Sequence, residues 1–153
     1  MEPTPLTELI EVPEATDYPA TGKVLSAEVG KVIFNPSGTR YQMHLLVAGP
    51  YTGPLNKPIQ ARISVQARKV YTVPRGGNFV TPIFGTPKII QGRIRHLTEK
   101  SLIVQAGAPV VVALPTEDSA IDLDEGSLAV GALVNVVAKP GAAFVFISDG
   151  LGK

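Results

Sequence analysis

The sequence predicts an all-β fold. Of its 153 residues, 15 are glycine and 14 are proline, and both residue types interrupt helices. Valine, isoleucine and threonine together contribute 40 β-branched residues, whose restricted side chains fit strands better than helices. Only residues 59–73 and 93–106 are free of glycine and proline over the length of an ordinary helix. Both segments have strand-like patterns, so we expect no long helix.

The earliest expected element is a hairpin that begins at residue 21 and turns at residues 28–31. Its second strand contains the apolar run 32–34, and a turn ending at Gly38 separates that run from the apolar-rich segment 41–46. Three short strands are therefore expected before residue 50.

The clearest expected strand covers residues 59–73. From Ile59 to Ala67, apolar and polar side chains alternate, which is the period of a half-buried strand. The alternation slips at Lys69–Val70, and one extra residue in a strand exchanges its two faces. We therefore expect a long strand with a β-bulge near residues 69–70.

Residues 21–73 and 91–147 resemble each other, which predicts an internal duplication. Gly22 and Gly92 begin the two copies, and a hairpin turn at residues 98–101 follows the second glycine as 28–31 follows the first. The offset between matched positions stays between 70 and 73 residues, and repeated units must share apolar positions to pack alike. The remaining segments are an extended acidic arm (1–20), a connector rich in proline and glycine (74–90) and a C-terminal tail (148–153).

Each copy is expected to hold about five short strands and one variable loop. In the number and spacing of its strands, such a unit resembles the small Greek-key barrels of the OB type. We favour two tandem small β-barrels. A single barrel of two interleaved halves is the alternative, because a half-barrel leaves strand edges that a second copy can pair.

The connector carries large apolar side chains, which a solvated linker would lack: Phe79, Val80, Ile83 and Phe84. One interpretation is that these residues pack across the junction of the two halves. The other is that Phe79, Ile83 and Phe84 anchor a partner protein, since an exposed apolar patch marks an interface.

Charge is strongly segregated along the chain. Residues 1–20 contain five acidic and no basic residues, and residues 116–125 also contain five acidic residues. Residues 57–100 contain nine basic residues against one acidic residue, so the net charge of +1 conceals opposed blocks. Arg62 and Arg68 are expected on one face of their strand, and Arg93 and Arg95 on one face of another.

Candidates for catalysis or metal binding are weak. His44 and His96 have no partner that would make either a catalytic residue, and the chain has no cysteine. The acidic segment 117–126 begins like an EF-hand loop, but Leu133 stands where the bidentate glutamate belongs. The closing segment 150–153 superficially resembles a phosphate loop but lacks its Ser/Thr and its helix. We predict no catalytic residues, no metal site and no cofactor.

The sequence therefore predicts a non-enzymatic structural or assembly subunit that binds itself or a protein partner. The expected partner-binding residues are Arg62, Arg68, Arg75, Phe79, Ile83, Phe84, Arg93 and Arg95. The alternative is an OB-like protein that binds nucleic acid through a basic sheet face. No apolar run approaches the about 18 residues that span a bilayer. The acidic N-terminus is unlike a targeting peptide, so we expect no membrane partner and a cytoplasmic location.

Overall fold

A computed structural model describes residues 18–115, 121–122 and 128–149, and this part of the chain contains strands and no helix. The prediction of an all-β fold is confirmed. The strands are β1 (Ala20–Glu28), β2 (Lys31–Pro36), β3 (Gln42–Leu46), β4 (Ile59–Thr72), β5 (Phe79–Thr81), β6 (Phe84–Gly85), β7 (Ile89–Leu97), β8 (Ser101–Gln105), β9 (Pro109–Ala113), β10 (Ile121–Asp122), β11 (Leu133–Ala138) and β12 (Ala143–Ser148).

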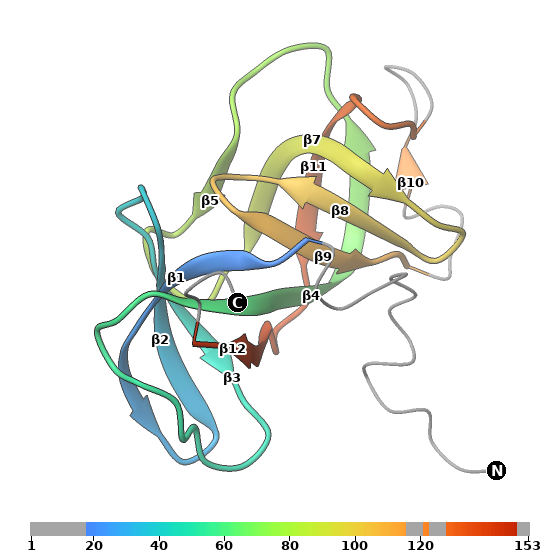
Figure 1. Ribbon diagram of the computed structural model, residues 1–153. Helices are drawn as coiled ribbons and strands as arrows, with labels where there is room; N and C mark the ends of the chain where they lie inside the picture. Colours follow the sequence, from blue (N-terminus) through green and yellow to red (C-terminus); the bar gives the residue numbers. More distant parts are fainter. Residues whose placement is uncertain (1–17, 116–120, 123–127, 150–153) are drawn as a thin grey trace, which may run out of the picture.

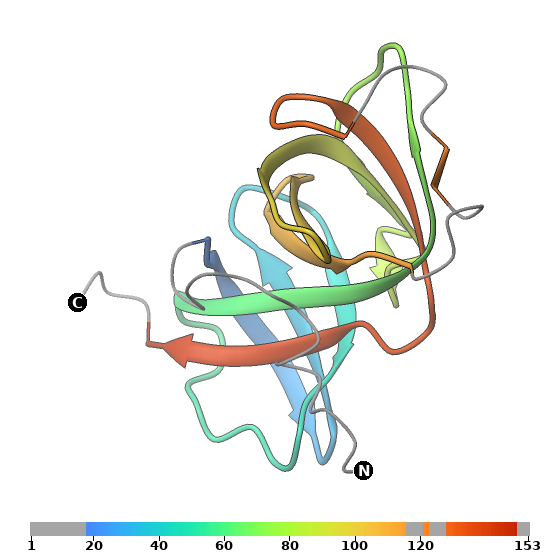
Figure 2. The same ribbon diagram turned by 90° about the vertical axis from the view of Figure 1, so that its right-hand side faces the viewer.

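These strands form one mixed sheet whose pairings make two circuits that share β4. The first circuit, called the first ring below, runs β1–β2–β3–β12–β4 and returns to β1. The second ring runs β7–β8–β9–β4–β11 and returns to β7. Figures 1 and 2 show the two groups of strands, with β4 passing from one to the other.

The two rings exchange a strand. The last strand in the described part of the chain, β12, pairs with β3 and β4 of the first ring, although it follows β11 of the second ring after only four residues. In return, residues 63–72 of β4 pair with β9 and β11 of the second ring. Strands from both halves of the sequence therefore complete each ring.

The buried face of the long strand β4 changes partway along, within the part that pairs with the second ring. Ala67 pairs with Ala138 and Lys69 pairs with Val137, so Arg68 between them is the extra residue of a bulge. Odd-numbered residues up to Ala67 are buried, whereas Val70 beyond the bulge is buried at an even position. The expected bulge is present, one residue before the expected position.

The backbone of the connector pairs with both rings and Val80 packs in the core, as one interpretation predicts, but Ile83 and Phe84 stay exposed. Its β5 pairs with β7 of the second ring, and its β6 pairs with β3 of the first ring. Val80 is buried, and its backbone N–H donates a hydrogen bond to the Tyr41 hydroxyl at 3.0 Å. The Thr81–Pro82 peptide bond between the two short strands is cis.

Both rings contribute to one continuous hydrophobic core. In the first ring the core is partly aromatic, with Phe34 and Phe144 at a ring-centroid distance of 5.4 Å and Tyr51 at 5.8 Å from Phe144. In the second ring it is aliphatic, with Ile94 and Leu102 among its fully buried members. Since Phe144 lies on β12, the exchanged strand fills the core of the ring that receives it.

The two hairpins share two local features. A Cβ atom on Gly22 would overlap the carbonyl oxygen of Asn35, and one on Gly92 would overlap that of Gln105, so both positions require the absence of a side chain. Each hairpin then contains a register shift two to four residues later, at Val24/Ser26 in β1 and at Ile94/His96 in β7.

Candidate binding groove

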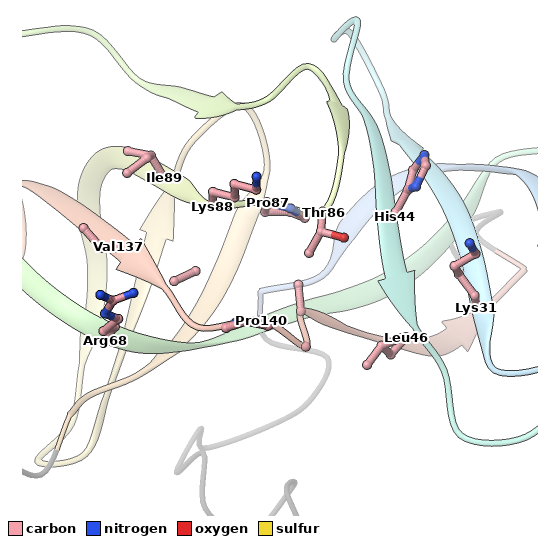
Figure 3. A pocket seen from close by; sticks show the side chains of 13 residues that line it. Lys31, His44, Leu46, Arg68, Thr86, Pro87, Lys88, Ile89, Val137 and Pro140 are labelled. Atoms are coloured by element: carbon pink, nitrogen blue, oxygen red, sulfur yellow. The ribbon is translucent and has the colours of Figure 1, made fainter.

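A groove of about 440 Å³ lies where the two rings meet, as Figure 3 shows. One wall comes from β2 and β3 of the first ring and another from β4 and β11. The connector and the four-residue link between β11 and β12 complete it. We call it the junction groove.

Alternation along β3 builds the first wall. Met43 and Leu45 are buried, so His44 and Leu46 face outward. Lys31 on β2 is the register partner of Leu46, and paired residues project from the same face of a sheet. The first wall therefore combines a cation, an imidazole and an apolar side chain that is 51% exposed.

The bulge of β4 and the end of the connector build the opposite wall. Arg68, the extra residue of the bulge, is exposed and lines the groove beside Val137. Lys88 is also exposed, and two hydrogen bonds fix its backbone: its N–H donates to Thr81 at 2.8 Å, and its carbonyl accepts from Ala138 at 2.9 Å. This wall thus adds two further cations, and hydrogen bonds hold the backbone of one of them, Lys88.

The charges that line the groove all have the same sign. Its lining contains the cations Lys31, Arg68 and Lys88 and no aspartate or glutamate. Within the described part of the chain, no hydrogen bond or ion pair occupies these three side chains. In Figure 3, Arg68 lies toward one end and Lys31 toward the other, with Lys88 between them. Three cations spaced along mostly apolar walls suit an extended ligand that carries several negative charges.

Phe84 borders this site. On β6 it is the parallel register partner of Gln42, which places it on the same outward face of β3 as His44 and Leu46. Its side chain is 64% exposed, and that of its neighbour Ile83 is 48% exposed. Phe79, in contrast, is half-buried. Two of the three predicted apolar anchors, Ile83 and Phe84, therefore lie on the surface. Phe84 shares the face of β3 that lines the groove, although neither anchor is itself a lining residue.

The predicted arginines are spread over several surfaces. Arg68 lines the groove, whereas Arg62 lies on β4 opposite Val145 of β12, where partial burial lowers the pKa of its guanidinium. Arg75 is exposed in the segment that follows β4.

Arg93 and Arg95 lie on the outer face of β7 and already have partners. Arg93 Nη1 donates a hydrogen bond to the Gly131 carbonyl at 2.9 Å. Arg95 Nη1 donates to Gln105 Oε1 at 3.0 Å, and its guanidinium lies 5.3 Å from the centre of the Tyr18 ring. This pair forms a surface separate from the junction groove.

The binding residues expected from the sequence did not include Lys31, His44 or Lys88. Lys88 was part of the basic block, and the outward position of His44 follows from the alternation in residues 41–46. These residues face Arg68 because of the way in which the two rings pack. No local sequence pattern predicts that packing.

Most of the acidic segment 117–126 and the closing segment 150–153 lie outside the described residues. Among the residues that are described, no three histidine, aspartate or glutamate side chains are close enough together to hold a metal ion. The same residues include no helix of the length and apolarity needed to cross a membrane.

Comparison with protein-family models, with curated proteins and with solved structures finds no match to this chain.

Proposed function

We propose that this protein is a non-enzymatic interaction protein that binds an acidic segment of a protein partner in the junction groove. The observation that carries the proposal is the combination of Lys31, Arg68 and Lys88 with apolar walls, beside the exposed Phe84. Carboxylates of the partner pair with the cations, and its apolar side chains cover the walls and Phe84.

The proposal includes a scaffold of two small OB-like barrels that arose by duplication and exchange their last strands. Five strands in each ring support this description. So do the matched glycines, Gly22 and Gly92, and the register shifts that follow them at the same spacing. Gly38 and Gly107, which end matched turns, both have positive φ, at 78° and 86°.

Nucleic acid is the second candidate ligand, favoured by one specific observation. Phe84 and His44 share an outward face with Lys31, and single-stranded nucleic acid is bound by aromatic side chains that stack on bases beside cations that contact phosphates. The largely apolar opposite wall, with Ile89 and Val137, favours a peptide instead.

Binding of two labelled probes separates these candidates. One probe is a fluorescein-labelled peptide of alternating glutamate and leucine, and the other is a labelled ten-nucleotide single-stranded DNA. Fluorescence anisotropy should show that the peptide binds and that Arg68→Glu with Lys88→Glu weakens its binding by about tenfold or more. Binding should also weaken with added salt, because partly exposed charges are screened.

Lys23→Glu with Lys57→Glu is the matched control, because both lysines are exposed and neither lines the groove. The control should bind the peptide as the unmodified protein does. If both double variants lose affinity for the peptide equally, the groove is not the binding site. Binding of the DNA alone, sensitive to Arg68 and Lys88, would overturn the peptide in favour of nucleic acid.

A further inference from the structure

The acidic arm of the chain has a repeat of three residues. Every third residue from position 8 is acidic: Glu8, Glu11, Glu14 and Asp17. A second set with the same spacing is apolar: Leu6, Leu9, Val12 and Ala15. Three residues per turn is the period of a polyproline II helix, and Pro3, Pro5 and Pro13 favour that conformation over an α-helix.

This repeat fits the junction groove. In a polyproline II conformation the acidic set forms one stripe, with carboxylates about 9 Å apart, and the apolar set forms the adjacent stripe. The groove offers Lys31, Lys88 and Arg68 at separate positions, together with the apolar Leu46 and Val137. The acidic stripe of the arm therefore complements the cations of the groove, and the apolar stripe complements the apolar residues of its walls.

We infer that the junction groove binds residues 5–17 of a second copy of this chain; the inference rests on the proposed function and names its partner. Tyr18, where the described chain begins, packs against Ile103 and Val111 on the outer face of β8 and β9. Its ring also lies 5.5 Å from that of His96. In the second ring β8 and β9 lie across from β11, which lines the groove. Tyr18 thus lies on the side of the second ring away from the groove.

With a second copy, the arm of each chain can enter the groove of the other chain, and two equivalent contacts form. In a two-fold symmetric dimer each arm enters the partner's groove, so the same contact forms twice. The two contacts reinforce each other, since formation of the first makes the second intramolecular. The product is a dimer held by exchanged arms.

A charge swap tests this dimer. The arm variant carries Glu8→Lys, Glu11→Lys and Glu14→Lys, and the groove variant carries Lys31→Glu, Arg68→Glu and Lys88→Glu. Light scattering after size-exclusion chromatography should show a dimer for the unmodified protein and monomers for each variant, with self-association weakened about tenfold or more. An equimolar mixture of the variants should restore the dimer, because both arm–groove pairs are then again of opposite charge.

The triple variant Lys23→Glu, Arg40→Glu and Lys57→Glu should remain dimeric, since these residues are exposed and lie outside the groove. A mixture that stays monomeric while both variants keep their far-ultraviolet circular dichroism would overturn the inference.

Peptide binding to a protein that lacks residues 1–17 separates failure of the inference from failure of the proposed function. A labelled peptide of residues 1–17 should bind, and a scrambled peptide of the same composition should bind more weakly. Binding of the glutamate–leucine peptide without binding of residues 1–17 would overturn the inference alone. Binding of neither peptide would overturn both. A monomeric unmodified protein whose truncated form binds residues 1–17 would place the arm in its own groove and overturn the dimer.

Discussion

The two rings use the same strand order but close it differently. In the second ring, β9 and β4 are joined by four register pairs from Ile63–Val110 to Gln66–Ala113. In the first ring, the corresponding β3 and β12 share only the pair Leu46–Ala143. We call each of these pairings a seam. The outward-facing residues of β3 line the groove next to the short seam. The candidate binding surface therefore lies beside the shorter of these two pairings.

Core substitutions test whether the exchanged strand supports the first ring as much as the resident strands support the second. Phe144→Ala on β12 should lower the free energy of unfolding by about 3–5 kcal/mol, and Ile94→Ala on β7 by about 2–5 kcal/mol. Both side chains are buried in the same core, so urea denaturation followed by circular dichroism should give a single transition in each case. A Phe144→Ala variant of unchanged stability would show that β12 is dispensable.

The matched glycines test how alike the hairpins are. Gly22→Ala and Gly92→Ala should each lower the free energy of unfolding by about 1–3 kcal/mol or more, because the new methyl group meets backbone that cannot move away. Gly77→Ala, where a Cβ meets no atom within 4 Å, is the control and should change stability little. Thermal denaturation measures all three. A large loss at only one of the two hairpin positions would break the comparison.

The seams themselves can be compared by hydrogen exchange. Backbone amides of β3 (residues 42–46) should exchange about tenfold or more faster than those of residues 110–113 in β9, because local opening is easier where strand pairing is short. The amides of Gln42 and Leu46, which donate to the carbonyls of Ile83 and Ala142 at 2.8 Å, should be the slowest on this edge of β3. Equal protection of both strands would contradict the assignment of a weak seam.

A smaller effect on the free energy of unfolding is expected at high pH, through the aromatic residue Tyr51 of the first ring. Burial raises the pKa of Tyr51, whose hydroxyl donates a hydrogen bond to the Pro54 carbonyl at 2.7 Å. The unfolded chain releases this proton near pH 10, before the folded protein does. The free energy of unfolding should therefore fall as the pH rises above about 10. Tyr51→Phe should make this fall with pH less steep. If the fall is equally steep in the variant, other groups cause it.

Local patterns were sufficient to predict much of the fold. The alternation from Ile59 to Ala67 gave the long strand, and the slip at Lys69–Val70 gave its bulge to within one residue. The two hairpins were expected from their turns and apolar runs. The strand exchange was not predicted, because the apolar pattern of β12 fits the edge of either ring equally well.

The site was predicted less completely, for a related reason. Ile83, Phe84 and Arg68 were selected because they stand out in sequence as apolar or basic residues in unusual places. Lys31 is an ordinary turn-proximal lysine in sequence, and it becomes part of a site only because β3 and the connector bring it opposite Arg68. Residues that act together across two halves of a chain carry no shared local signal.

One residue near the middle of the sequence brings the two ends of the described chain together. Ala61 on β4 pairs with Ala20 on one side and with Phe146 on the other. Two strand spacings, about 10 Å in all, therefore separate the first and last strands at that point. A linker of a few glycines from β12 back to β1 can join them without disturbing either ring. A circular permutant that begins in the exposed segment 75–78 should keep every strand pair and carry its new ends at the turn between β4 and β5.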